Sequence, residues 1–292
     1  MTLLYNTSAA WAEAPQKNIA VFGMSGLGKT RLAQLLRAGG DWYHYSVDYR
    51  IGTAYMGEYI EDNLKSQAMT VPFLADLLRS DSICIRSKIR FENLSPLSTF
   101  LGKPGARDKG GLNIDEYMRR QALHRRAEIN ALLDTPSFIA RARDLYTYPH
   151  FICDTGGSIC EVVNPHDPKD EVLVTLSTHC LLVWIKDPAG YTDELIRRFD
   201  RDPKPLYYNP EFLLSLWQRH LDETGLTPDA VDPNTFARVA FTHAMAHRAP
   251  LYHAMAENWG VTVQAAEVET VRDAQDVVAL IARALAQRDV RA

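Results

Sequence analysis

The sequence predicts an α/β fold built on a doubly wound, five-stranded parallel sheet with helices on both faces. The first observation is a set of five short apolar runs without alternation, which is typical of strands buried on both faces. The second is that helix-forming segments separate or follow these runs, as in repeated β-α units. The third is a glycine-rich stretch directly after the first run. The predicted strands are Asn18–Gly23, Tyr43–Asp48, His150–Asp154, Cys180–Ile185 and Val261–Ala265.

Helices are expected between and after the strands. Lys29–Arg37 consists largely of helix-forming residues. Asn113 with Glu116 three residues later has the capping-box pattern of a helix start, and Thr135-Pro136 places proline in the first turn of another helix. Further helices are predicted at Tyr191–Phe199, Pro210–Glu223, Pro233–Asn258 and Asp273–Gln287.

One connection is much longer than the others. About a hundred residues separate the second and third strands, whereas crossovers are usually short. We interpret residues 51–147 as a large, mostly helical insertion that packs over the sheet edge, within a single domain spanning residues 1–292. Its basic stretch Met118–Arg126 indicates either a solvated helix face or a contact with an anionic ligand or nucleic acid.

Composition narrows the functional class. A net charge of −4 and a pI near 6.1 do not favour a general nucleic-acid binder. Four cysteines in 292 residues do not form a disulfide framework, and reduced thiols fit a cytoplasmic protein. The sequence has no apolar run of the roughly 18 residues that a membrane span needs, and its first residues lack a basic leader. We therefore expect a cytoplasmic protein without membrane segments.

The glycine-rich stretch is a phosphate-binding loop by pattern. Residues 23–30, GMSGLGKT, match G-x-x-x-x-G-K-[ST] at every fixed position, between a predicted strand and a predicted helix. Glycines allow backbone N–H groups to surround phosphates, and the helix N-terminus favours negative charge. Lys29 is expected to contact the β- and γ-phosphates, and the Thr30 hydroxyl to ligate Mg²⁺. The nucleotide-binding residues predicted here are Gly23, Ser25, Gly26, Leu27, Gly28, Lys29, Thr30 and Arg31.

A second carboxylate for the metal is available at the end of the third predicted strand. Asp154 could hold Mg²⁺ directly or through water, or it could only cap the following helix. The spacing from Asp154 to Gly157 is also that of GTPases, but the chain has no Asn-Lys-x-Asp guanine motif. ATP and Mg²⁺ are therefore the predicted cofactors.

Several further motifs occur in the order found in one family. Asp48 follows the second predicted strand with Arg50 two residues later, and Gly156-Gly157 follow the third strand. Lys204-Pro205-Leu206 and the R-x-P-L-Y stretch that begins at Arg248 come later in the chain. With the phosphate-binding loop, this series resembles the small-molecule P-loop kinases, and the shikimate kinases most closely. The resemblance covers the first 50 residues and roughly residues 150–290.

The resemblance implies roles for these residues. Asp48 would orient or deprotonate an acceptor hydroxyl, although it could instead cap a turn. Arg50, Gly156, Gly157 and Arg248 would contact the acceptor, with Arg248 holding an anionic group unless it is a surface helix residue. A lid at about residues 190–209 would supply Lys204, where the family usually has arginine, and Arg198 to stabilise the transferred phosphoryl group. Lysine lacks the bidentate fork of arginine, a role that Arg197, Arg198 or Arg201 could take.

The predicted function is ATP- and Mg²⁺-dependent phosphoryl transfer to a small hydroxylated, anionic molecule. One alternative is a nucleoside or nucleotide kinase in which the insertion binds a base. Another is a regulatory ATPase that acts as a nucleotide-dependent switch, with the insertion as the surface for a protein partner. Production of ADP that depends on a small molecule favours a kinase, and hydrolysis accelerated by a protein favours the switch.

Overall fold

The computed structural model describes residues 3–188, 191–201, 203 and 205–289. The chain divides into two compact units. The sheet unit consists of Met1–Val47, Glu128–Arg201 and Phe241–Ala292, and the helical unit consists of Asp48–Ala127 and Asp202–Ala240. Residues 128–147 of the predicted insertion thus group with the sheet. The expectation of one domain with an insertion and a lid stays a prediction.

The sheet unit contains five parallel strands in the order β2-β3-β1-β4-β5. The prediction of a five-stranded parallel sheet in a P-loop α/β fold is confirmed. β1 lies between β3 and β4, so the strand order reverses at β1: β2 and β3 lie on one side of it, and β4 and β5 on the other. In open parallel sheets, ligands bind beyond the carboxyl ends of the strands at such a reversal. The strands are β1 Asn18–Phe22, β2 Trp42–Ser46, β3 His150–Asp154, β4 Leu181–Lys186 and β5 Gly260–Gln264.

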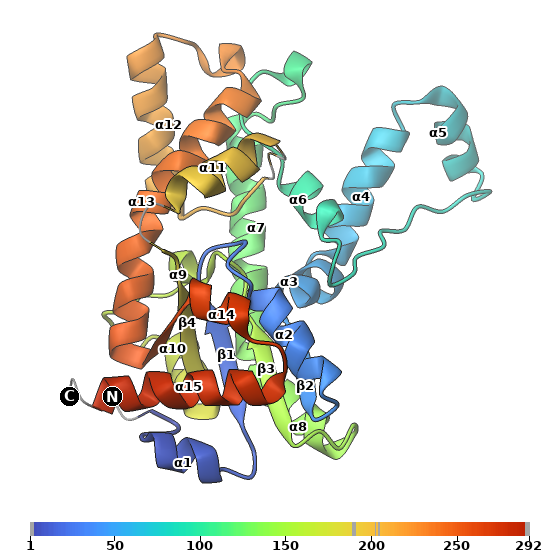
Figure 1. Cartoon of the computed structure of the whole chain (residues 1–292). Helices are drawn as coiled ribbons and strands as arrows, with labels where there is room; N and C mark the ends of the chain where they lie inside the picture. The colour runs from blue at the N-terminus through green and yellow to red at the C-terminus, as the bar shows by residue number, and fades with distance from the viewer. Residues whose placement is uncertain (1–2, 189–190, 202, 204, 290–292) are drawn as a thin grey trace. The chain divides into compact units, whose positions relative to one another are not determined.

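Continuous apolar runs become strands here because helices cover both faces of the sheet (Figure 1). One layer contains α15, which contacts both α1 and α2, and the other contains α8 and α10, which contact each other. These helices are α1 Ser8–Glu13, α2 Lys29–Ala38, α8 Thr135–Asp144, α10 Glu171–His179 and α15 Ala274–Asp289. The unit also contains α9 Ile159–Val162, α11 Thr192–Arg201 and α14 Ala265–Thr270, with the later parts of α7 Ile114–Leu133 and α13 Pro233–Trp259.

The helical unit begins inside α3 Val47–Arg50 and contains the first parts of α7 and α13. Its own helices are α4 Gly57–Ala68, α5 Pro72–Arg79, α6 Ser95–Leu101 and α12 Pro210–Thr224. Short turns of tighter or wider helix lie at Ile51–Tyr55, Arg107–Lys109 and Pro228–Ala230. Within the described ranges, none of the helices combines the length and hydropathy needed to span a bilayer.

Candidate functional site

The loop between β1 and α2 has the conformation that its glycines allow. Gly23, Gly26 and Gly28 have φ angles of 138°, 89° and 94°, a region that side chains with a Cβ rarely adopt. A methyl group on Gly23 would also lie 2.6 Å from the Ile185 carbonyl oxygen and 3.4 Å from Cδ1 of Trp184. The loop therefore requires glycine at these positions and lies directly beyond the carboxyl end of β1.

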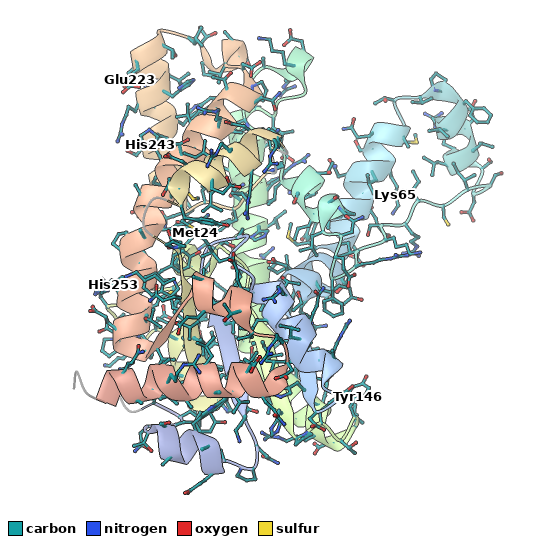
Figure 2. The ribbon with its side chains drawn as sticks, viewed as in Figure 1. Met24, Lys65, Tyr146, Glu223, His243 and His253 are labelled. Atoms are coloured by element: carbon teal, nitrogen blue, oxygen red, sulfur yellow. The ribbon has the colours of Figure 1, made fainter. Side chains whose placement is uncertain are left out.

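Lys29 directs its ammonium group back into this loop. Lys29 is 7% exposed, and its Nζ donates hydrogen bonds to the carbonyl oxygens of Gly23 at 2.8 Å and Met24 at 3.0 Å. Met24 lies on the loop next to this contact (Figure 2). Because α2 begins at Lys29, the ammonium charge and the positive end of the helix dipole coincide at one place. The arrangement suits a polyanionic phosphate group.

Thr30 and Asp154 meet at the end of the central strands. Thr30 Oγ1 donates a 2.9 Å hydrogen bond to Asp154 Oδ2, and the Asp154 residue is only 6% exposed. A hydroxyl and a carboxylate are hard oxygen donors of the kind that Mg²⁺ prefers, so these residues fit the predicted metal. The side chain of His44 on β2 lies nearby, with Nε2 3.6 Å from Asp154 Oδ2.

Sequence reasoning missed His44. The signal that could have found it is strand register, because β2 pairs with β3 and places Ser46 opposite Asp154. His44 is two residues earlier and so shares a face with Ser46. A single sequence does not show which strands are neighbours, so this contact was not predictable.

The glycine pair after β3 also reaches the phosphate-binding loop. A methyl group on Gly157 would overlap the hydroxyl of Ser25, and it would lie 3.2 Å from the Ser25 main-chain nitrogen. Only a glycine permits this approach. The structure thus brings Gly157 and Ser25 together, two residues that the sequence assigned to different parts of the site.

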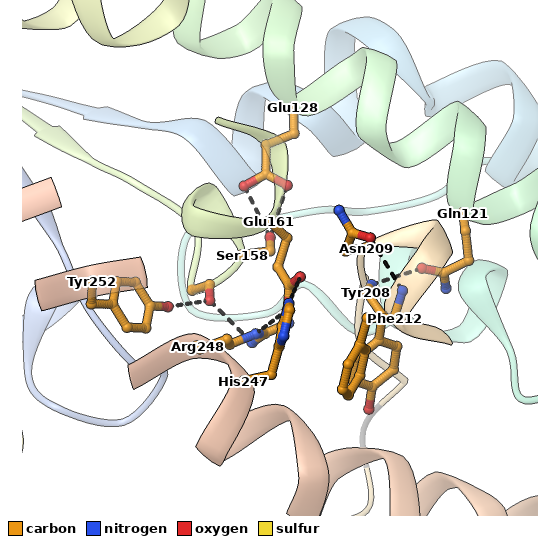
Figure 3. Close-up of polar contacts among 11 residues, drawn as sticks. Gln121, Glu128, Ser158, Glu161, Tyr208, Asn209, Phe212, His247, Arg248 and Tyr252 are labelled. Atoms are coloured by element: carbon orange, nitrogen blue, oxygen red, sulfur yellow. Dashed lines mark hydrogen bonds and ion pairs between the residues drawn. The ribbon is translucent and has the colours of Figure 1, made fainter. Parts of the chain in front are cut away.

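Arg248 is buried within the sheet unit and holds Gly157 (Figure 3). The arginine residue is 3% exposed, its Nε donates to Glu161 Oε1 at 2.7 Å, and its Nη1 donates to the Gly157 carbonyl oxygen at 3.1 Å. The Tyr252 hydroxyl donates to the same carbonyl at 2.5 Å. His247 Nε2 lies 3.3 Å from the other Glu161 oxygen. Arg248 is therefore an interior residue and not the surface helix residue of the alternative interpretation.

Burial governs the charges in this cluster. Burial is the largest single influence on the pKa of the Arg248 guanidinium and lowers it. The charge and hydrogen bond of Glu161, together with Tyr252 and Cys160, keep that pKa above its usual value. Burial raises the pKa of the neighbouring Cys160 thiol to about 12, so this cysteine stays a neutral thiol. The Glu161 side chain has no exposed surface, which makes the guanidinium its necessary counter-charge.

A second buried carboxylate steadies the same segment. The Ser158 hydroxyl lies 2.9 and 2.8 Å from the two carboxylate oxygens of Glu128, and both residues are buried. Ser158 directly follows Gly157. Arg248 and Tyr252 therefore hold Gly157, and Glu128 holds the next residue, Ser158.

The two remaining arginines predicted for the nucleotide site differ in placement. Arg31 donates to the main-chain oxygens of Val268 at 2.6 Å and Val271 at 2.9 Å, which ties α2 to α14 and its end. Arg198 on α11 donates to Glu194 at 3.0 Å, and its Nη1 lies 3.5 Å from the Gly26 carbonyl oxygen. That hydrogen bond to Glu194 raises the pKa of Arg198 above its usual value. Arg198 is thus a cation beside the phosphate-binding loop.

The other predicted acceptor residues belong to the helical unit. Asp48 and Arg50 lie in α3 directly after β2, and the Arg50 guanidinium carbon lies 5.3 Å from the centre of the Tyr55 ring. Lys204 lies outside the described residues. The roles of Asp48 and Arg50 toward an acceptor, and of Lys204 toward the transferred phosphoryl group, stay predictions.

Comparison with known proteins gives a structural likeness but no sequence match. No protein-family model matches the chain, and no curated protein sequence matches it. Among solved structures, the chain is similar to a shikimate kinase from Bacteroides thetaiotaomicron, with 15% sequence identity and a TM-score of 0.37. The match covers 95% of this chain and 99% of that one. The strand order and the geometry of the loop after β1 are those of a P-loop α/β fold.

Proposed function

We propose that this protein is an ATP- and Mg²⁺-dependent phosphotransferase that acts on a small hydroxylated, anionic metabolite. The observation that carries the proposal is the convergence of Lys29 with the Thr30–Asp154 pair at the carboxyl end of β1 and β3. A buried ammonium, a helix N-terminus and two hard oxygen donors together match a nucleoside triphosphate and its metal ion.

The chemistry follows from charge. In phosphoryl transfer, negative charge spreads over the γ-phosphoryl oxygens, and catalysis consists mainly of positioning and electrostatic stabilisation. Lys29 and the N-terminus of α2 supply fixed positive charge on one side, and Arg198 beside Gly26 supplies a cation on α11. Thr30 and Asp154 would hold Mg²⁺, which neutralises charge on the phosphate oxygens when it is bound.

The proposal assigns contacts with the acceptor to Asp48, Arg50 and the glycine pair. Asp48 orients or deprotonates the acceptor hydroxyl, and Arg50 contacts the acceptor. Lys204 would stabilise the transferred phosphoryl group. Arg248 contributes through Gly157, because its guanidinium is already paired with Glu161 and with the Gly157 carbonyl. The buried pair thereby fixes the chain segment that faces Ser25 of the phosphate-binding loop.

The direct test is a screen for ADP release from ATP and Mg²⁺ in the presence of small hydroxylated acids and phosphorylated alcohols. Release that requires one acceptor, with the acceptor recovered as its phosphate ester, supports the proposal. ADP release at the same rate without any acceptor would identify an ATPase instead.

Asp48→Asn should lower kcat for the identified acceptor and leave ATP affinity nearly unchanged. Asparagine keeps the shape of aspartate but removes its negative charge and basicity, and general-base assistance contributes about 10²–10⁴-fold to a rate. Steady-state kinetics and calorimetric ATP titration measure the two quantities separately. Wild-type kcat in this variant would remove Asp48 from the site.

Asp154→Asn should raise the Mg²⁺ concentration needed for half-maximal turnover, and EDTA should stop turnover of the wild type. The amide keeps one oxygen toward Thr30 but loses the charge that attracts a divalent cation. Asp170→Asn is the matched control, since Asp170 caps α10 through the Leu173 N–H. Identical Mg²⁺ titrations for wild type and Asp154→Asn would contradict the metal assignment.

A further inference from the structure

Within the helical unit, the chain between α5 and α6 contains an extended segment. Residues 83–89 have no regular secondary structure, and they return from the end of α5 alongside α4 (Figure 1). The Arg86 guanidinium lies 3.0 Å from Glu61 on α4, and the Ser87 N–H donates to the same carboxylate at 3.3 Å. The segment is therefore attached to α4 through Glu61.

Its side chains alternate as they do in a β-strand. Every second residue is half-buried or buried, and the residues between them are exposed and mostly basic. The inner row is Ile83, Ile85, Ser87 and Ile89, and the outer row is Cys84, Arg86, Lys88 and Arg90. A segment with this period and these two rows has the side-chain pattern of a strand with one apolar and one basic face.

Among the described residues, no strand pairs with the main chain of this segment. In the part of the chain that the structure describes, the Ser87 N–H is the only main-chain group of residues 83–89 with a hydrogen bond. An unpaired row of N–H and C=O groups is a template for another extended chain, and proteins usually cover or shorten such edges. Here the row extends over residues 83–89 and is interrupted only at the Ser87 N–H, which binds Glu61.

Apolar surface adjoins the segment. A groove of about 450 Å³ lies between α4, α5 and the segment. Lys65 on α4 marks one border (Figure 2). At the start of α5, Phe73 is 72% exposed. The apolar side chains that line the groove are Met69, Leu78, Ile83 and Ile85.

The basic side chains of the outer row determine which kind of chain can pair with the segment. If a second copy of this chain paired antiparallel through the same segment, Arg86, Lys88 and Arg90 would face basic residues of the other copy, and like charges directly opposite each other destabilise a strand pair. Neither Lys88 nor Arg90 has an ion-pair partner among the described residues. An incoming strand with carboxylates at alternate positions would supply those partners.

We propose that residues 83–90 are a docking strand for an extended segment of a partner protein in which acidic and apolar residues alternate. Main-chain hydrogen bonds to the unpaired row provide the pairing, as in other complexes formed by strand addition. The carboxylates of the partner lie beside Arg86, Lys88 and Arg90. Its apolar residues lie beside Ile83 and Ile85 and fill the groove.

The test uses the full chain and a fluorescently labelled, end-blocked peptide of about nine residues in which valine and glutamate alternate, to match the length of the segment. Binding is measured by the fluorescence polarisation of the labelled peptide, at protein or peptide concentrations up to about 1 mM. We expect saturable binding, together with slower hydrogen exchange at the amides of residues 83–89. An analogue methylated at alternate amide nitrogens, which cannot pair along one edge, should not bind.

The double variant Lys88→Glu/Arg90→Glu should bind the peptide with an affinity lower by about tenfold, because each opposed pair of unlike charges becomes a pair of like charges. The matched control is Arg125→Glu/Arg219→Glu, which makes the same charge change at two exposed residues of α7 and α12. Equal weakening in both double variants would indicate a general charge effect and overturn the proposal. Three other results would also overturn the proposal. They are absence of peptide binding, equal binding of the methylated analogue, and tighter binding of a single-stranded oligonucleotide at the same residues.

Discussion

Lys29→Met should reduce kcat for ATP turnover by at least about 10²–10³-fold, the loss typical when one donor to a developing anion is removed. The side chain of Lys29 is buried against the loop, so methionine preserves much of its packing while removing the charge. Nucleotide affinity should also fall, since each charge-assisted hydrogen bond contributes about 1.5–3 kcal/mol. Single-turnover kinetics and calorimetric ATP titration measure the two losses.

The control for this variant is Lys169→Met, at an exposed lysine after α9. It should retain wild-type turnover and ATP affinity. Thermal unfolding of both variants shows whether the loop still folds, because Lys29 also donates to the Gly23 and Met24 carbonyls. A folded Lys29→Met protein with undiminished turnover would refute the assignment of this loop as the triphosphate site.

Arg248→Met should lower the free energy of unfolding by about 3–5 kcal/mol, the cost of leaving a buried charge without its partner. Glu161 has no exposed side-chain surface, so water cannot replace the guanidinium. The variant also removes one of the two hydrogen bonds that hold the Gly157 carbonyl. Urea unfolding at neutral pH measures the loss.

The double variant Arg248→Met/Glu161→Gln separates the effect of an unpaired buried charge from the effect of the changed side-chain shapes. Removing both charges should recover a large part of the stability that the single variant loses, because neither member of the pair then leaves the other as a buried charge without its partner. Arg272→Met is the surface control, since the Arg272 guanidinium pairs with Asp276 while 83% exposed, and its removal should leave unfolding nearly unchanged. Equal stability of Arg248→Met and wild type would mean that Glu161 finds another partner in the folded protein.

The parts of the fold that depend on local patterns could be predicted from the sequence. All five predicted strands are present. The bounds of β3 are as predicted, and the ends of the others differ by at most two residues, as for β2 at Trp42–Ser46 instead of Tyr43–Asp48. The helix predicted at Thr135 begins there, with proline in its first turn. The capping box at Asn113 is wrong in part. The Asn113 side chain accepts from the Asp115 N–H, but Glu116 binds Arg119 and Arg120.

Partners that are distant in sequence could not be predicted. Arg248 is 87 residues from Glu161 and 91 from Gly157, so nothing in the local pattern reveals that its charge is already paired. The same holds for His44 beside Asp154. The phosphate-binding loop was predictable because its glycines, lysine and threonine are contiguous. The docking strand shows the opposite case, since the alternation in residues 83–90 is visible in the sequence but its unpaired main chain is not.

The approach of Trp184 to the phosphate-binding loop gives the protein an optical reporter of its own. The indole is nearly buried at the end of β4, next to Gly23, and among the described residues its Nε1 has no hydrogen-bond partner. The emission of an indole depends on nearby charge and polarity, and a triphosphate at Gly23 would change both. Nucleotide occupancy can therefore be followed in the unlabelled protein by intrinsic fluorescence, with Trp184→Phe identifying which part of the emission comes from the loop.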